Sequence, residues 1–138
     1  AYDHLEKGAV FAAEAVGFPL EQTVKTLVVT WSDNQYCLAL TPGNCQLSLK
    51  KVAKAMAAKR IMMADEKEAE KVTGYKVGGI SPFGTKRRLP VVMEQHLTRF
   101  SEVMLNAGQR GIMLKMDPES ILTALSCKTA PISDSISG

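Results

Sequence analysis

The sequence predicts an α+β fold built around a curved, mixed β-sheet. Extended and helical segments are interspersed along its 138 residues, and short turns join two pairs of extended segments into hairpins, which disfavours an all-parallel sheet. No internal repeat or linker divides the chain, and 46% hydrophobic content over this length supports one core rather than two. We therefore predict one domain at residues 1–131, followed by a flexible tail at 132–138.

The first predicted elements are a short helix and a β-hairpin. Residues 8–16 are rich in alanine and end at Gly17, a pattern typical of a helix with a glycine stop. Residues 24–31 and 36–40 are β-branched and apolar, and the turn-forming Ser32-Asp33-Asn34-Gln35 separates them. These two runs are expected to form a buried antiparallel hairpin.

Two further helices are predicted after the hairpin. In the first, the apolar residues fall on one helical face: Leu49, Val52, Ala53 and Met56. Its lysines lie mostly around the opposite face: Lys50, Lys51 and Lys54. After a short strand at 61–63, Asp65 followed by Glu68 predicts a capping box and a helix that ends near Gly74.

The second half of the chain begins with an irregular loop, GGISPFG at 78–84. Three glycines and a proline exclude regular structure there, but the apolar Ile80 and Phe83 indicate a packed loop. Three strands are predicted after it: 89–93, 100–105 and 111–116. A tight turn at 106–110 is expected between the last two, and Asp117-Pro118 is typical of the start of a final helix.

Composition and missing motifs exclude several classes of protein. A net charge of +3 and a pI near 8.8 permit a nucleic-acid partner without requiring one. Cys37, Cys45 and Cys127 are widely spaced, and His4 and His96 stand alone, so neither a disulfide framework nor a metal site is predicted. GxSxG, GxGxxG and Walker A patterns are absent. With no membrane-spanning run or signal peptide, we expect a cytoplasmic protein.

Lys25 is the first candidate functional residue, because it lies near the start of an otherwise apolar strand. Its side chain must either extend to solvent at the strand end or point into a polar cavity. In the second case, its ammonium would bind a phosphate or orient an ester and its attacking water. The strand pattern leaves both interpretations open.

The GGISPFG loop and the basic residues also have two interpretations each. The loop is either a simple connection or a site where glycine N–H groups stabilise an oxyanion during attack on an ester. The basic residues either form a solvated face or bind backbone phosphates: Lys50, Lys51, Lys54, Lys86, Arg87, Arg88 and Arg110.

Four segments together resemble the YbaK/prolyl-tRNA synthetase editing-domain family: VKTLVV, LSLKKVAKAM, ADEKEAEKVTGYKVGGISPFG and AGQRG. The resemblance runs from about Tyr2 to the final helix. It implies a pseudo-barrel sheet flanked by helices and a trans-editing deacylase similar to the Cys-tRNA(Pro) deacylases. Such an enzyme hydrolyses the ester at the 3′-terminal adenosine of a mischarged tRNA. The implied substrate is tRNA(Pro) carrying cysteine or another small amino acid, with prolyl-tRNA synthetase as a partner and without a metal, cofactor or membrane.

The resemblance also implies roles for individual residues. The family's indispensable lysine before threonine falls on Lys25, which would orient the substrate, and its GxxxP loop falls on residues 78–82. Gly78 and Gly79 would contact the carbonyl or the water. The remaining residues would line the substrate site: Tyr2, Thr26, Ile80, Ser81, Pro82, Asn106, Gly108 and Arg110.

Three differences from the known cysteinyl-tRNA deacylases leave the amino acid open. Gly8 stands where those enzymes have an aromatic residue, although Phe11 is close by in sequence. Asn106 and Met113 replace a serine and an aspartate. The alternative to an editing enzyme is therefore a catalytically inactive module of the same fold that binds tRNA or a synthetase. Hydrolysis of a small aminoacyl ester unrelated to tRNA is a third possibility.

Overall fold

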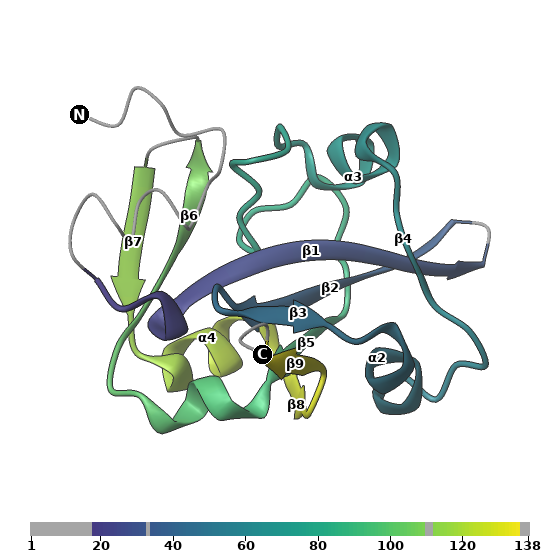
Figure 1. Cartoon of the computed structure of the whole chain (residues 1–138). Helices are drawn as coiled ribbons and strands as arrows, with labels where there is room; N and C mark the ends of the chain where they lie inside the picture. The colour runs from purple at the N-terminus through teal and green to yellow at the C-terminus, as the bar shows by residue number, and fades with distance from the viewer. Residues whose placement is uncertain (1–17, 33, 110–111, 136–138) are drawn as a thin grey trace.

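The structure is a computed structural model that describes residues 18–32, 34–109 and 112–135. Its main sheet has seven strands in the order β7-β6-β1-β2-β5-β8, with β4 also paired to β1 (Figure 1). Neighbours pair antiparallel in β1–β2, β1–β4 and β6–β7, and parallel in β1–β6, β2–β5 and β5–β8. The prediction of an α+β fold with a mixed sheet is confirmed. The helix predicted at 8–16 lies outside the described residues.

The elements have the following bounds. The main sheet contains β1 (Thr23–Ser32), β2 (Gln35–Pro42), β4 (Met62–Met63), β5 (Val91–Glu94), β6 (Val103–Gln109), β7 (Ile112–Met116) and β8 (Lys128–Ala130). A second, two-stranded sheet contains β3 (Cys45–Leu47) and β9 (Ser133–Ser135). The helices are α2 (Leu49–Ala55), α3 (Glu66–Thr73) and α4 (Pro118–Leu125), with 3-10 turns η1 (Leu20–Gln22) and η2 (Gln95–Arg99).

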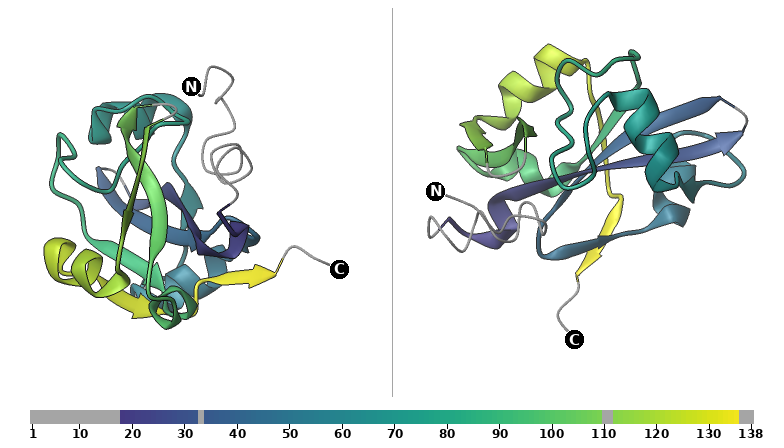
Figure 2. Two further views of the ribbon diagram at one scale, coloured as in Figure 1. Left: turned by 90° about the vertical axis from the view of Figure 1, so that its left-hand side faces the viewer. Right: turned by 90° about the horizontal axis from the view of Figure 1, so that it is seen from above.

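The helix ends form for the reasons expected from their capping residues. The Asp65 carboxylate accepts a hydrogen bond from the N–H of Glu68, whose side chain accepts one from the N–H of Asp65, which completes the capping box. Gly74 ends α3 in the left-handed conformation. Asp117 caps α4 through the N–H of Ser120. The views in Figures 1 and 2 show α3 and α4 far apart, on either side of β1.

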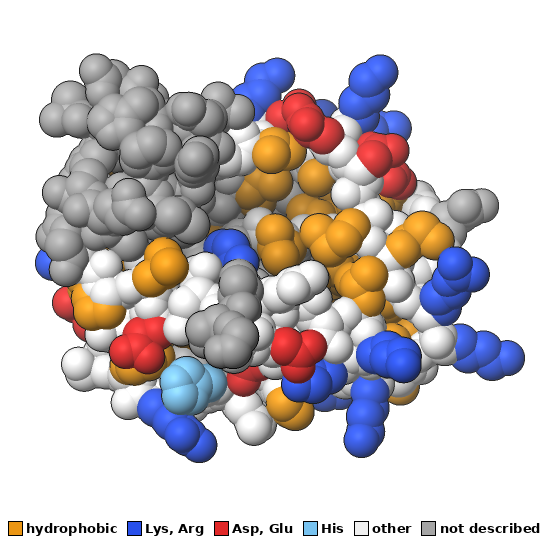
Figure 3. All heavy atoms as spheres, viewed as in Figure 1, with side chains coloured by type: hydrophobic (Ala, Val, Ile, Leu, Met, Phe, Trp, Pro, Cys, Tyr) orange, Lys and Arg blue, Asp and Glu red, His pale blue; other side chains and the backbone are white. Residues whose placement is uncertain are grey.

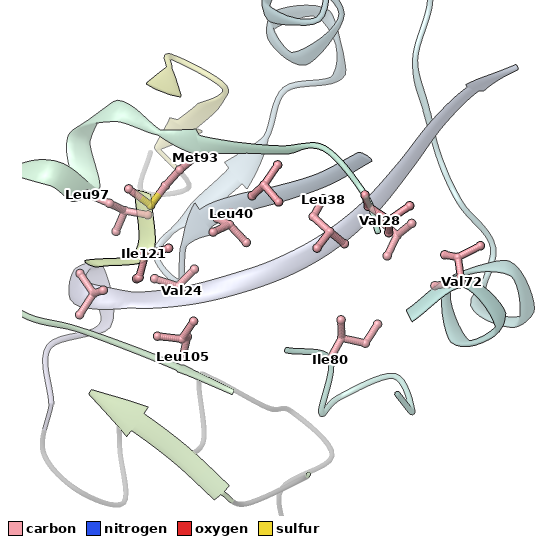
Figure 4. Close-up of a cluster of buried hydrophobic side chains, with 14 residues drawn as sticks. Val24, Val28, Leu38, Leu40, Val72, Ile80, Met93, Leu97, Leu105 and Ile121 are labelled. Carbon is pink, nitrogen blue, oxygen red and sulfur yellow. The ribbon is translucent and has the colours of Figure 1, made fainter. Parts of the chain in front are cut away.

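Two apolar clusters lie on the two faces of the hairpin. Val24 and Val28 of β1 belong to the larger cluster, which also contains Leu40 and Ile80 (Figure 4). Val29 belongs to the smaller one, with residues of α2. Because successive strand residues point to opposite faces, even-numbered residues of β1 face the larger cluster, and odd-numbered residues face the other side.

The C-terminal segment differs from the expected flexible tail at its first four residues. Ile132 is fully buried, and β9 pairs with β3. The carboxylate of Glu94 accepts hydrogen bonds from the N–H groups of Ile132 and Ser133, at 2.9 and 3.0 Å, and from the Ser133 hydroxyl at 2.6 Å. Residues 132–135 are therefore held in the fold by burial of Ile132 and by hydrogen bonds to the carboxylate of Glu94.

The turn predicted at 106–110 is also misplaced. β6 continues to Gln109, and Asn106 pairs with Met113 of β7. The register shifts between Asn106 and Gln109, where Gly108 has a φ of 97°. A bulge in a strand and a turn use the same residue types, which explains the error. Within the described residues, no helix combines the length and apolar character needed to cross a membrane.

Candidate functional site

One edge of β1 is only partly paired. Along the other edge β1 pairs with β2 from Val24 to Ser32. On this edge β6 pairs at Thr23 and Val24, and β4 pairs at Val29 and Thr30. In Figure 1, β6 and β4 leave β1 near its two ends, and the segment between α3 and β5 lies above the part between them. No strand of the described residues pairs with this edge at residues 25–28, which we call the β1 gap.

The backbone of Thr26 points into the β1 gap. The C=O of Thr23 faces β2, because it accepts a hydrogen bond from the N–H of Gly43 at 2.8 Å. The C=O of Val28 faces the opposite edge, because it accepts one from the N–H of Ala64 at 3.0 Å. Since strand backbone groups alternate in direction, the N–H and C=O of Thr26 face the same edge as those of Val28.

The side chain of Thr26 is buried without a partner. The residue is 8% exposed, and its hydroxyl has no hydrogen-bond partner. It lies between Val24 and Val28 on the face of β1 that packs against Ile80. A buried hydroxyl without a partner costs about 1–3 kcal/mol, so this position is a candidate for ligand contact.

Lys25 lies on the opposite face of β1. Its ammonium donates a hydrogen bond of 2.6 Å to the backbone C=O of Cys45. Burial lowers the pKa of Lys25 below its usual value, and the nearby Cys45 partly offsets this. The lysine therefore does not simply extend to solvent: it is half-buried and held by β3.

The loop after α3 is packed, as predicted, and it lies against β1. Residues 79–82 are buried, and Ile80 belongs to the cluster of Val24 and Val28. Gly78 has a φ of 96°, which favours glycine. The N–H of Gly79 donates to the C=O of Lys76 at 2.9 Å, so this amide is already used in a turn. The hydroxyl of Ser81 accepts a hydrogen bond from the N–H of Phe83 at 3.1 Å.

Tyr75 connects this loop to β6. Its hydroxyl donates to the C=O of Phe83, and its ring lies so close to Gly108 that a Cβ there would be 2.6 Å from Cε1. Gly108 therefore has both a positive φ and no room for a side chain. The neighbouring Asn106 is 7% exposed, and its Oδ1 has no hydrogen-bond partner.

The structure brings together only part of the predicted site. Thr26 and Ile80 lie on the same side of β1, where the loop packs. Gly108 contacts Tyr75, which is bonded to the loop. Lys25 faces the other side of β1, and Pro82 is buried within the loop. Tyr2 and Arg110 lie outside the described residues.

Two of the predicted phosphate-binding residues are engaged elsewhere. Lys51 forms an ion pair with Asp134 at 2.6 Å. The Arg87 guanidinium donates to the Oδ1 of Asn34 at 2.8 Å and lies 5.5 Å from the centre of the Tyr36 ring. These contacts give both side chains a structural role on the surface.

Sequence reasoning missed three residues of this region. Tyr75 fixes the loop to β6, and Cys45 supplies the acceptor for Lys25. Thr41 pairs with Lys25 across the hairpin, is fully buried and has a hydroxyl without a partner. Correct pairing of the predicted hairpin would have identified Thr41, whereas the other two contacts depend on distant segments.

The described cysteines are poorly suited to act as nucleophiles. Burial raises the pKa of Cys37 to about 12 and that of Cys127 to about 11. Burial also raises the pKa of Cys45. The thiolate is the reactive form, and all three thiols stay protonated near neutral pH. Among the described residues, no group of three or more His, Cys, Asp or Glu side chains is placed to hold a metal ion.

The face that carries the β1 gap is hollowed. Figure 3 shows hydrophobic side chains gathered above the middle of β1, with lysine and arginine side chains around them toward the right. An apolar depression with a few polar groups is the usual form of a small-ligand site.

Comparisons with known proteins agree on one family. The model of the aminoacyl-tRNA editing domain matches residues 6–124. A protein of Enterococcus faecalis, named as a candidate Cys-tRNA(Pro)/Cys-tRNA(Cys) deacylase, is 36% identical over 94% of this chain and 78% of its own length. A proline–tRNA ligase of Trichlorobacter lovleyi is 30% identical over 70% of this chain. The matched part is 17% of the length of that enzyme.

A solved structure supports the same relationship. It is described as a candidate trans-editing enzyme for prolyl tRNA synthetase, and it superposes with a TM-score of 0.85 at 26% identity. The superposition covers 94% of this chain and 81% of that one.

Proposed function

Because the chain belongs to the aminoacyl-tRNA editing domain family, we propose that it hydrolyses the ester joining a wrong amino acid to the 3′-terminal adenosine of a tRNA. The substrate is tRNA(Pro) carrying cysteine or another small amino acid. The observation that carries the proposal is the β1 gap, where a buried Thr26 without a hydroxyl partner faces a packed glycine loop. This position offers unused polar groups beside an apolar surface.

The reaction adds water to the ester carbonyl and releases the free amino acid and a tRNA with an intact terminal hydroxyl. Negative charge develops on the carbonyl oxygen during attack, and backbone N–H donors stabilise it. The N–H of Gly78 is the loop donor that we assign to this role, because the N–H of Gly79 is bonded to Lys76. The described thiols stay protonated near neutral pH, so we assign the attack to water or to a substrate hydroxyl.

Lys25 orients the substrate in this proposal. Its ammonium is partly desolvated and bound to one backbone carbonyl, so it can exchange that partner for a phosphate or ribose oxygen of the terminal nucleotide. A phosphate is the stronger acceptor because it carries charge.

The test is release of amino acid from tRNA(Pro) charged with cysteine, alanine or serine. Wild-type protein is expected to hydrolyse at least one of them, and Lys25→Ala to lower kcat/KM on the order of a hundredfold, as loss of a positioned charged group does. Lys67→Ala, an exposed lysine on α3, is the matched control and should retain activity. If wild type binds tRNA but releases nothing from the panel, the chain is an inactive binding module.

We also propose that the reaction needs no metal and that recognition of the tRNA is shared with prolyl-tRNA synthetase. Activity unchanged by EDTA is expected. Binding of tRNA should weaken steeply with salt as phosphate contacts are screened, whereas hydrolysis of a small free ester should not. Co-purification with the synthetase tests the partner: full tRNA selectivity without any association would contradict it.

A further inference from the structure

The β1 gap exposes the backbone groups of one residue to this edge. On this edge, Val24 is paired with β6, and the C=O of Val28 is bonded to Ala64 of the β4 segment. Only alternate residues point their backbone groups to a given edge, so Thr26 alone presents an N–H and a C=O between these two partners. A longer peptide strand would collide with β6 or β4, and a single amino-acid unit matches the opening.

We propose that Thr26 binds the aminoacyl group of the substrate as a one-residue strand. The inference rests on the proposed function and names how that site recognises its substrate. In a hydrogen-bonded antiparallel pair, one residue exchanges both N–H···O=C bonds with one partner residue. An aminoacyl ester carries an ammonium and a carbonyl on the same Cα. The ammonium donates to the C=O of Thr26, and the ester carbonyl accepts from its N–H.

The pairing has a consequence for catalysis. The carbonyl oxygen that accepts from the N–H of Thr26 is the atom on which negative charge develops when water attacks. This N–H is therefore a second catalytic oxyanion donor, supplied by the strand in addition to the loop N–H of Gly78. Its direction is fixed by the pairing of β1 on both sides of the gap, so no reorganisation is needed.

The pairing also places the substrate side chain. Side chains of a directly opposed antiparallel pair lie on the same face, so the side chain of an L-amino acid lies beside the hydroxyl of Thr26, on the face that packs against Ile80. Thr26 is only 8% exposed, so the space beside its hydroxyl is small, which favours small side chains. The hydroxyl without a partner can hydrogen-bond the thiol or hydroxyl of cysteine or serine.

The first experiment changes the substrate. The amino acid identified by the panel is compared with its deaminated counterpart on the same tRNA, for example alanyl with propionyl, each rate divided by its uncatalysed rate. Loss of the ammonium donor should reduce this acceleration about ten- to a hundredfold, as loss of a charged hydrogen bond does. Equal acceleration of both esters would overturn the inference and leave the deacylase function standing.

The second experiment removes the backbone N–H of Thr26 by replacing the residue with its α-hydroxy acid analogue, which keeps the side chain. We expect kcat to fall on the order of a hundredfold. The same replacement at Thr30, whose N–H points to the same edge but lies where β4 pairs, is the matched control and should retain activity. A loss at Thr26 no larger than at Thr30, with both proteins folded, would contradict the assignment. If wild type hydrolyses no mischarged tRNA, the proposed function fails and the inference falls with it.

Discussion

The two edges of β1 differ sharply in how they are used. One edge pairs with β2 from Val24 to Ser32. The other pairs only at its two ends, with β6 and with β4, and leaves the backbone of Thr26 unpaired by any described strand. The fully paired edge stabilises the fold, whereas the interrupted edge retains polar groups that a ligand can use. A strand in the middle of a sheet can thus support both a core and a binding site.

The largest expected effect on stability is at Leu40 of β2, the strand that pairs with the full edge of β1. Leu40 lies opposite Thr26 on β2 and is fully buried. Leu40→Ala should lower the free energy of unfolding by about 2–5 kcal/mol, because it removes apolar contacts and leaves a cavity. Urea titration measures this loss. Leu27→Ala, at a half-buried leucine on the opposite face of β1, is the control; a cost equal to that at Leu40 would mean that full burial adds nothing to the loss at Leu40.

The next effect tests the contact between β6 and the loop. Gly108→Ala should destabilise by about 1–3 kcal/mol, because alanine is strained at a φ of 97° and its Cβ would collide with the Tyr75 ring. A double-mutant cycle with Tyr75→Ala separates the two causes: the collision is relieved in the double variant and the backbone strain remains. Additive effects would show that Tyr75 does not limit this position.

The elements of the fold were largely predictable because local signals specify them. The Asp65–Glu68 capping box, the Asp117-Pro118 helix start and the β1–β2 hairpin each depend on residues close in sequence. The contact of Ile132 with the core depends instead on the carboxylate of Glu94, 38 residues away. No local signal opposes fraying there, so the sequence alone predicts a flexible tail.

The sequence proposes residues for the candidate site but does not give their geometry. Lys25 and Thr26 were selected together, yet strand alternation places their side chains on opposite faces. The β1 gap depends on where β6 and β4 join β1, and both strands follow β1 in the chain by tens of residues. A single sequence indicates which residues form strands. It does not show as readily at which residue the pairing between two strands ends.

A smaller effect concerns a buried polar group whose hydrogen bonds are satisfied. Burial by itself raises the pKa of Glu94, but hydrogen bonds from the Ser133 hydroxyl and from the N–H groups of His96, Ile132 and Ser133 together lower it below the usual 4.5. Because the folded-state pKa is the lower one, this carboxylate contributes stability above pH 4.5 that is lost as the pH falls through the folded-state value.

Glu94→Gln should therefore reduce stability near neutral pH by about 1–2 kcal/mol and flatten its decline in acid. Thermal unfolding between pH 3 and pH 7 measures both. Glu119→Gln, which changes an exposed carboxylate of α4, is the control for general acid sensitivity. An unchanged slope in Glu94→Gln would show that other carboxylates dominate the acid response.

The smallest expected effect has the opposite sign and compares two buried threonines. The Thr26 hydroxyl has no partner, whereas the hydroxyl of Thr73, 1% exposed, donates to the C=O of Ala69 at 2.7 Å. Valine keeps the shape of threonine and removes the hydroxyl, so Thr26→Val should leave stability unchanged or raise it by up to about 1 kcal/mol, while Thr73→Val should lower it by about 1 kcal/mol. Urea titration of both variants measures the contrast. If Thr26→Val also lowers the free energy of unfolding, the Thr26 hydroxyl has a hydrogen-bond partner in solution. Thr26 is then no longer a candidate for ligand contact through an unpaired hydroxyl.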